Sequence, residues 1–400
     1  MKVFAVISEF NPFHNGHRYL FEQLRLSGAT HIVAIMSGSF VQRGEPAILS
    51  KYTRAKCALL GGADLVLELP AVWASASAQR FALGGVGLAD ALGCVDTLAF
   101  GSECGDAGKL CAAERLIHGG AFSKEIKENL AQGKSYARAV SEASRNSGPA
   151  LESILRHPNN TLAIEYIHAL HTLSSGISPF TVRRTGAAHD SKQAAGSIAS
   201  ASHIRRLLLE KDGAAFAFMP ESCAAPVREE IANGRVSDLR LLERALLYRL
   251  RCMDRADFSA LPDVTEGLEN RIYGAVRRYT CLSDIIMGVK TKRYTYARIR
   301  RIIMNAFLGI TADMQAAPVP YLRVLGLSGS GAQILKKAKE TAKLPVIIKT
   351  TDSLSKLNGG QKNILALDLR AADLQALSFW KASPCGEDYY TSPVRVNQVP

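Results

Sequence analysis

The sequence predicts an α/β protein with a doubly wound parallel sheet, followed by a helical region and a small C-terminal α/β module. Over the first hundred residues, short runs rich in Val, Ile and Leu alternate with helix-like stretches, which is the βαβ pattern of a parallel sheet. Beyond residue 212 the pattern becomes helical and strongly basic, and strand-like runs return near the end of the chain.

Four short apolar runs have the length and composition of buried strands, and helix-like stretches separate them. We expect these strands at 3–8, 31–36, 64–69 and 96–100, with helices at 16–27, 50–61 and 75–92. A helical insertion at about 105–175 is expected before a further strand at 180–184 and a helix at 201–210.

The remaining chain reads as helical from 214 to 307, then as strand 321–327, helix 332–342 and strand 345–349. We therefore expect a catalytic domain at 1–212, a basic helical region at 213–315 and a C-terminal module at 316–400. The glycine-rich turn at 326–331 lacks the Lys-Ser/Thr of a phosphate loop, so we interpret it as a strand-to-helix turn.

Composition narrows the class of protein. The chain has 400 residues and is 47% hydrophobic, yet Asp64 and Glu68 interrupt the best candidate for a membrane span. The apolar start is too short for a signal peptide. Eight cysteines are scattered without CxxC pairs, which favours reduced thiols in a cytoplasmic protein. No membrane and no protein partner is expected.

The positive charge points to a polyanionic partner. The formal charge is +13, and residues 271–310 hold nine basic residues and a single acid, Asp284. So concentrated a basic excess is typical of a nucleic-acid contact surface.

The segment His14-Asn15-Gly16-His17 follows the first strand and begins a helix. Unpaired N–H groups at a helix start, two imidazole donors and a glycine without a Cβ together suit a nucleotide triphosphate. There are two alternatives to a nucleotide site. The histidines could stand at the helix start by chance. They could also be half of a metal site, but no matching Cys or His spacing follows, so we expect no protein-held metal.

The position of this motif in the predicted sheet favours a ligand site. Ligands of doubly wound sheets bind beyond the carboxyl ends of the strands. The segments 14–17, 37–39, 68–70 and 101–103 all stand at such ends.

Three further segments could complete a nucleotide site. Ser202 and Arg205 would lie together on the first turn of a helix, although a simple serine cap is an alternative. Asn159 could bind a ribose or base, or cap a helix. Arg184, at a strand end, could contact phosphate or stack on adenine.

Residues 290–301 interleave cations with tyrosines, a combination suited to phosphate contact and base stacking in RNA. An apolar stripe at helical spacing should pack on the body of the protein, leaving the arginines mostly facing outward. A solvated charged helix is the alternative. We expect RNA contacts from Lys290, Lys292, Arg293, Arg298 and Arg301.

These segments resemble a known family. His14-Asn-Gly-His17 is similar to the HIGH signature of nucleotidyltransferases and class I aminoacyl-tRNA synthetases, and Ser202-His-Ile-Arg205 resembles their Ser-x-Ile-Arg element. More narrowly, the chain resembles the bacterial tRNA(Met) cytidine acetate ligases. The segments that carry this resemblance are 9–17, 36–46, 100–103, 158–160 and 290–295, spread over most of the chain.

The resemblance implies a HIGH-type nucleotidyltransferase-like Rossmann domain and a specific reaction. Acetate, ATP and the wobble cytidine of elongator tRNA(Met) would give N4-acetylcytidine, AMP and pyrophosphate through acetyl adenylate, with Mg²⁺ accompanying ATP. It implies catalytic roles for His14, His17, Ser202 and Arg205. The residues that it implies in ATP binding are Ile7, Ser8, Glu9, Phe10, Asn11, Pro12, Phe13, His14, Asn15, Gly16, His17, Arg18, Tyr19, Leu20, Gly101, Asn159 and Arg184.

Cys104 stands where the family is expected to have a polar residue, so no contact is assigned to it. Two other functions stay open. One is a nucleotidyltransferase that adenylylates a small phosphorylated substrate, and the other is a non-catalytic RNA-binding protein with a nucleotide fold.

Overall fold

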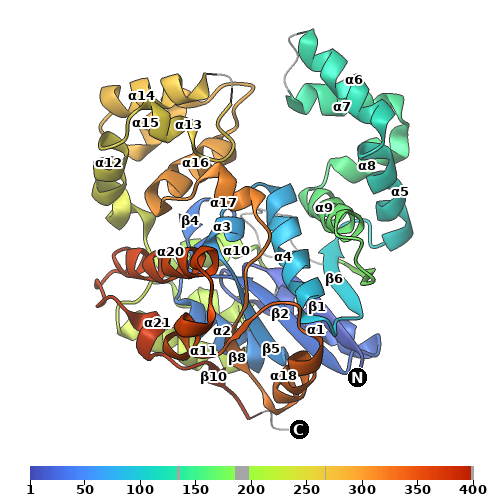
Figure 1. Ribbon diagram of the computed structural model, residues 1–400, viewed down its shortest axis with the longest axis vertical. Coiled ribbons are helices and arrows are strands. Elements are labelled where there is room, and N and C mark those ends of the chain that lie inside the picture. The colour runs from blue at the N-terminus through green and yellow to red at the C-terminus, as the bar shows by residue number, and fades with distance from the viewer. Residues whose placement is uncertain (133–135, 185–197, 266, 398–400) are drawn as a thin grey trace.

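The computed structural model of the chain describes residues 1–132, 136–184, 198–265 and 267–397 (Figure 1). Its centre is an eight-stranded sheet in the described residues, with the order β10-β8-β5-β2-β1-β6-β7 and β9 paired to β8. The strands are β1 Val3–Ser8, β2 His31–Ser37, β5 Leu65–Leu69, β6 Thr97–Ser102, β7 Ser178–Arg183, β8 Leu322–Leu327, β9 Val346–Ile347 and β10 Val394–Arg395.

The strand order is that of a doubly wound sheet. From β1 the chain moves outward through β2 and β5, then crosses back to β6 and β7 on the other side of β1. The strand neighbours from β5 to β7 are parallel, as the sequence predicts. The direction of winding reverses between β1 and β6, and that is where such folds bind ligands.

Alternation along β1 shows how the sheet is covered on both faces. Val3, Ala5 and Ile7 belong to one apolar cluster, while Phe4 and Val6 belong to the other. The first cluster includes side chains of α4 (Ala78–Leu92) and α9 (Pro158–Thr172). The second includes α1 (Asn15–Leu26), α2 (Lys51–Leu60), α10 (Ala201–Leu209) and α11 (Glu221–Ala232).

Two groups of helices extend upward from the sheet in Figure 1. One is the insertion expected at about 105–175, which forms α5 Ala107–Ile117, α6 Gly120–Ala131, α7 Tyr136–Asn146, α8 Pro149–Leu155 and α9. The other is the basic helical region, with α12 Glu243–Arg251, α13 Arg255–Ser259, α14 Leu268–Arg278, α15 Leu282–Val289, α16 Tyr296–Leu308 and α17 Ala312–Ala316.

The last part of the chain completes the central sheet. β8 pairs antiparallel with β5, and β9 and β10 pair parallel with β8. Ser328 caps α18 (Gly329–Thr341) directly after β8, so the glycine-rich turn is the expected strand-to-helix turn. Beyond it lie α20 (Gly359–Ala376) and α21 (Glu387–Tyr390).

A buried ionic cluster fastens this last part to the sheet. Lys51 of α2 bonds Glu68 of β5 at 2.8 Å and Asp388 of α21 at 2.7 Å, and Arg323 of β8 lies 3.2 Å from Asp388. All four side chains are at most 3% exposed. Two cations therefore meet two carboxylates in the interior, a balance without which their burial would be costly.

All eight cysteines are free, as their scattered spacing predicts. Within the described residues, the helices are too short or too polar for a membrane-spanning segment.

Candidate active site

A cavity of about 520 Å³ opens beside the carboxyl ends of β1 and β6. Its lining joins the loop after β1 with the ends of β6 and β7 and with the starts of α9 and α10. The residues that the sequence places in separate motifs, His14, Gly101, Asn159, Arg184 and Arg205, thus share one cavity.

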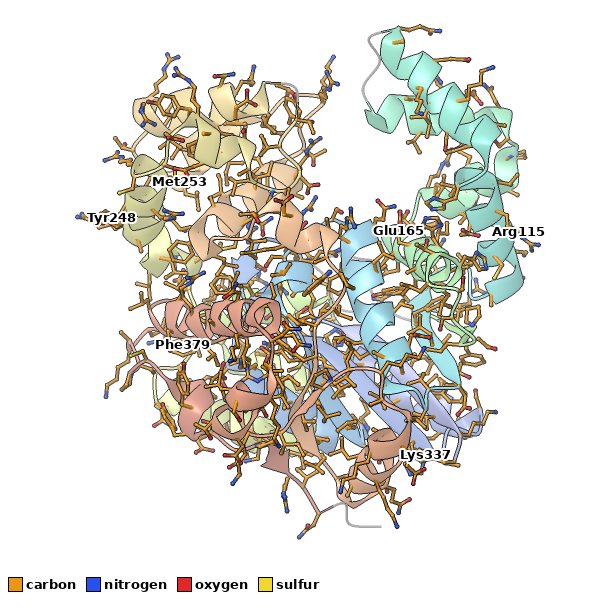
Figure 2. The ribbon with its side chains drawn as sticks, in the orientation of Figure 1. Arg115, Glu165, Tyr248, Met253, Lys337 and Phe379 are labelled. Carbon is orange, nitrogen blue, oxygen red and sulfur yellow. The ribbon has the colours of Figure 1, made fainter. Side chains whose placement is uncertain are left out.

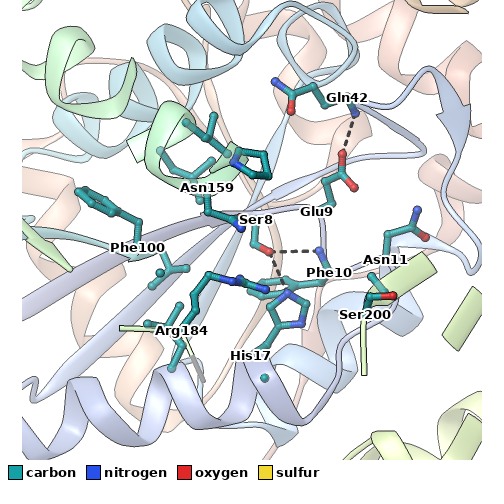
Figure 3. A pocket seen from close by; sticks show the side chains of 18 of the residues that line it. Ser8, Glu9, Phe10, Asn11, His17, Gln42, Phe100, Asn159, Arg184 and Ser200 are labelled. Carbon is teal, nitrogen blue, oxygen red and sulfur yellow. Dashed lines mark hydrogen bonds between the residues drawn. The ribbon is translucent and has the colours of Figure 1, made fainter. Parts of the chain in front are cut away.

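The two histidines of the motif fix the start of α1 with their own side chains. Nδ1 of His14 accepts a hydrogen bond from the N–H of Gly16 at 3.1 Å, and Nδ1 of His17 accepts one from the N–H of His14 at 3.2 Å. Since both Nδ1 atoms act as acceptors, each neutral ring carries its proton on Nε2. His17 Nε2 lies 3.4 Å from the Ser8 hydroxyl, as Figure 3 shows.

Both imidazoles are held neutral. Burial, with the positive charges of Arg184 and Arg205, lowers the pKa of His14 to about 3. Burial, the neighbouring His14 and Arg184 lower the pKa of His17 well below its usual value. At neutral pH the pair therefore offers two N–H donors and no net charge.

The absence of a side chain at Gly16 leaves room for the His14 ring. A Cβ at position 16 would lie 2.9 Å from Cε1 of His14, closer than side-chain carbons pack. Any larger residue would displace the ring that caps the helix. The glycine thus serves the histidine beside it, in addition to the close ligand approach that the sequence suggests.

Ten residues of the predicted loop line the cavity, namely Ile7, Ser8, Glu9, Phe10, Asn11, His14, Gly16, His17, Tyr19 and Leu20. The other four serve the fold in this structure. Pro12 and Phe13 are buried, and Phe13 packs on Phe21. Asn15 donates to the Ala217 carbonyl at 3.3 Å, and Arg18 is an exposed partner of Glu22.

The cavity is strongly cationic. Among the described residues of its lining, the charged ones are a single acid, Glu9, and five arginines, namely Arg43, Arg183, Arg184, Arg205 and Arg301. Burial raises the pKa of Glu9 despite these cations, and the Glu9 carboxylate accepts a 3.0 Å hydrogen bond from the Gln42 N–H. Such a wall suits a polyanionic ligand.

Ser202 and Arg205 lie together on the first turn of α10, as their spacing predicts. Nη2 of Arg205 donates to the Ser202 hydroxyl at 3.2 Å, and Nη1 of Arg43 donates to it at 3.1 Å. Arg205 also donates to the Asn11 carbonyl at 2.8 Å and lies 3.3 Å from Glu45. The helix cap is Ser200, so the Ser202 hydroxyl is not used for capping.

The far side of the cavity is built around Glu103. Asn159 donates to one Glu103 oxygen at 2.6 Å, and the N–H of Asn160 donates to the other at 3.0 Å. The Arg184 side chain is exposed, and its guanidinium lies beside His17 in Figure 3. Gly101 lies against it, since a Cβ there would be 3.2 Å from Arg184 Cγ.

The basic helix α16 differs in part from its prediction. Its apolar stripe is buried as expected, at Ile299, Ile302, Ile303, Ala306 and Phe307. The outward orientation is wrong for Arg300 and Arg301, whose side chains are 20% and 17% exposed. Arg300 forms an ion pair with Glu45, and Arg301 lines the cavity. Both turn toward the cavity because the segment around Glu45 lies against this helix.

The remaining predicted tRNA contacts lie outside the cavity lining. Lys290, Lys292 and Arg293 are exposed on the loop between α15 and α16. Arg298 is half-buried and donates to the Asp263 carbonyl at 2.6 Å.

Several residues of the site escape the sequence analysis. Gln42 and Arg43 follow the short strand β3 (Phe40–Val41), and the segment 36–46 that carries part of the resemblance was the available signal. Arg54, fully buried, donates to the carbonyls of Glu9, Ser37 and Gly38 and so holds the loops after β1 and β2. Burial lowers the pKa of Arg54 to about 10, which leaves it charged at neutral pH.

Comparison with known proteins shows the family to which the whole chain is similar. Residues 1–387 match the model of the family described as HIGH Nucleotidyl Transferase. The tRNA(Met) cytidine acetate ligase of Thermoanaerobacter sp. (strain X514) is 37% identical over 399 residues, covering 97% of this chain and 98% of that protein. The ligase of the same name from Clostridium kluyveri (strain NBRC 12016) is 36% identical and covers 100% of both chains.

The fold of this chain is also similar to solved structures of a related protein. Thermotoga maritima TmcAL in its apo form superposes with a TM-score of 0.93 at 32% identity, with 100% of both chains covered. The same protein bound with alpha-thio ATP has a TM-score of 0.91 at 31% identity, again over 100% of both chains.

Proposed function

Because this chain belongs to the HIGH nucleotidyl transferases and, among them, to the tRNA(Met) cytidine acetate ligases, we propose that the cavity beside His14 and His17 is its catalytic site. The enzyme uses ATP and acetate to acetylate the wobble cytidine of elongator tRNA(Met), with acetyl adenylate as intermediate. The observation that carries the site assignment is the pair of histidines, each fixed through Nδ1 by a backbone N–H, in the lining of a cavity that also contains five arginines.

In the first step, an acetate oxygen attacks the α-phosphorus of ATP. The bond from that phosphorus to the bridging oxygen of the β-phosphate breaks, and pyrophosphate leaves. His14 and His17 would donate hydrogen bonds to the α-phosphate oxygens, where negative charge accumulates during attack. Because both donors are held in place before ATP binds, no reorganisation is needed at the moment of reaction.

Ser202 would hold the leaving pyrophosphate together with Arg43 and Arg205, the two arginines that donate to the Ser202 hydroxyl. Arg205 is 12% exposed and is fixed by bonds to Ser202 and Asn11, so its guanidinium is already oriented. A positioned guanidinium binds phosphate oxygens in a bidentate manner. Ile7, Gly101, Asn159 and Arg184 would contact the rest of the nucleotide from the opposite wall.

In the second step, the N4 amine of the cytidine attacks the acetyl carbon of the adenylate. The amide bond forms, the bond to the AMP oxygen breaks, and a proton leaves the amine. A wobble base lies in an unpaired loop, so its insertion costs less than flipping a base out of a duplex.

The tRNA would be bound by the basic helical region. Lys290, Lys292 and Arg293 are exposed at one end of α16, where phosphate contacts are possible. Arg301 is on the same helix and lines the cavity, so one helix reaches from the exposed basic loop to the catalytic site. Arg298, which donates to the Asp263 carbonyl, would hold the loop between α13 and α14.

We propose that ATP enters the cavity as its magnesium complex. Glu9 is the one carboxylate in the described lining of the cavity, and it is flanked by arginines. This set does not suit a dedicated Mg²⁺ cage, and the triphosphate itself would supply the oxygens that the ion prefers. We also propose a cytoplasmic location, and the functional division 1–212, 213–315 and 316–400.

Omission experiments test the proposed function. Pyrophosphate release is measured with acetate and tRNA each left out in turn, followed by nucleoside analysis of the tRNA. The expected result is pyrophosphate that depends on acetate, and N4-acetylcytidine that depends on all three substrates. Pyrophosphate release without acetate would indicate an adenylyltransferase for another substrate. Tight tRNA binding without ATP turnover would indicate a non-catalytic RNA-binding protein.

A further inference from the structure

A cluster of histidines and glutamates lies between α5 and α9, outside the lining of the cavity. Glu114 and His118 come from α5, and His168 and His171 come from α9. Nδ1 of His168 lies 3.0 Å from one Glu114 oxygen, and Nδ1 of His171 lies 2.9 Å from the other. The rings of His118 and His168 stack with centroids 3.4 Å apart and an interplanar angle of 7°.

Two buried polar atoms in this region lack a partner among the described residues. They are Nε2 of His118 and Oε2 of Glu165, which precedes His168 by one helical turn. Buried polar groups are almost always hydrogen-bonded, so the unpartnered nitrogen of His118 leaves room for a ligand in the cluster.

The cluster has the chemistry of a transition-metal site. Glu114, His118 and His168 each offer a ligand atom, and these atoms lie within 4.8 Å of one another. Imidazole nitrogens with a carboxylate oxygen suit zinc, whereas Mg²⁺ and Ca²⁺ prefer oxygen ligands alone. We propose that Glu114, His118 and His168 bind a Zn²⁺ ion, while His171 holds the second oxygen of Glu114.

The position of the cluster indicates a structural role. Glu114 is eight residues beyond Asp106, the cap of α5, which places it about 12 Å along the helix from the end nearest the cavity. In Figure 2, Arg115 lies at the outer edge of the molecule and Glu165 on the inner side of the same helix pair. The ion would join α5 to α9, whose first turn carries Asn159.

The spacing of the ligands supports the same interpretation. Glu114 and His118 are four residues apart, and His168 and His171 are three apart, so each pair shares a face of its helix. The two helices pack with these faces toward each other, which the bonds from Glu114 to both histidines of α9 establish. The proposal does not depend on the reaction assigned to the cavity.

Metal titration of the full-length chain tests this site. The protein is stripped with a chelator and titrated with Zn²⁺ by calorimetry, and the metal content is measured after dialysis. We expect one Zn²⁺ per chain and a higher melting temperature with the ion than without it. We expect His118→Ala and His168→Ala to weaken binding by at least about tenfold. His157→Ala is the matched control, since His157 is exposed at the start of α9 and lies outside the cluster.

Equal affinity in all four proteins, or no binding by the wild type, would overturn the proposal. If the alanine variants do not fold, Co²⁺ added to the wild type decides the question. Visible bands of tetrahedral cobalt with nitrogen and oxygen ligands support it. Cobalt–thiolate bands would instead locate the metal on cysteines and refute the site.

Discussion

His14 and His17 hold each other in a fixed orientation: their rings stack with centroids 3.8 Å apart, and the backbone N–H of His14 donates to Nδ1 of His17. The consequence is chemical as well as structural. With Nδ1 occupied in both rings, Nε2 becomes the donor on each, and both donors exist before any substrate binds. The donors proposed for the α-phosphate are therefore built by the helix cap itself.

Replacing His17 by alanine removes one of these donors. We expect the rate of acetyl-adenylate formation from ATP and labelled acetate to fall by about 100-fold or more, the usual cost of losing one such donor. Loss of the capping bond should also lower stability by about 1 kcal/mol, measured by urea unfolding. A normal rate in a folded His17→Ala protein would exclude the role given to this side chain.

The neutral histidines make stability depend on pH in a defined direction. His14 has a folded pKa of about 3, while an unfolded histidine titrates near its usual value of about 6.5. Below that value the unfolded chain binds the extra proton, so stability is greatest above pH 6.5 and falls as the pH decreases. Between pH 6.5 and 5 the loss is about 2 kcal/mol for this histidine. His14→Asn should flatten the pH dependence of urea unfolding by that amount, and an unchanged dependence would contradict the buried, neutral state.

Arg205 and Arg206 are neighbours with opposite environments, which makes them a matched pair. The Arg205 side chain is 12% exposed and bonded to Ser202, whereas Arg206 is 52% exposed and pairs with Glu210. We expect Arg205→Ala to lower kcat/KM for ATP by about 100-fold, because a positioned guanidinium at the phosphates is lost. Arg206→Ala should change it less than about twofold. Similar losses in both variants would show that the effect comes from general charge.

A pair of lysines tests the proposed tRNA surface. Lys292→Ala should weaken tRNA binding and reduce the slope of log affinity against log salt by about 0.7 to 0.9, because one phosphate contact is lost. ATP affinity should stay the same. Lys337→Ala is the control, since Lys337 is 50% exposed on α18 and lies at the opposite end of the molecule from the basic region (Figure 2). Unchanged tRNA affinity in Lys292→Ala would remove this loop from the interface.

Much of the fold follows from local pattern. The strands at β1, β2, β5 and β6 and the helices between them are predicted because a buried parallel strand is a continuous apolar run, and each is followed by its own helix. The antiparallel pairing of β8 with β5 could not be predicted. Their partner choice depends on contacts between segments more than two hundred residues apart, which no local pattern encodes.

The site was predictable where its residues share one element or one edge of the sheet. Ser202 and Arg205 meet because three residues span one helical turn. The orientation of Arg300 and Arg301 was not predictable, since it depends on Glu45 and a cavity formed by distant segments. Arg54 was missed for a similar reason: its partners are backbone carbonyls, which leave no signature in a sequence.

The ionic cluster around Asp388 has a consequence for how the enzyme is made. A nascent chain that has not yet reached residue 388 would bury Lys51 and Arg323 without the Asp388 carboxylate that contacts both of them. An unpaired buried charge costs several kcal/mol, enough to keep the centre of the sheet from closing. We therefore expect the sheet that supports the histidine loop to close only after residue 388 has been synthesised.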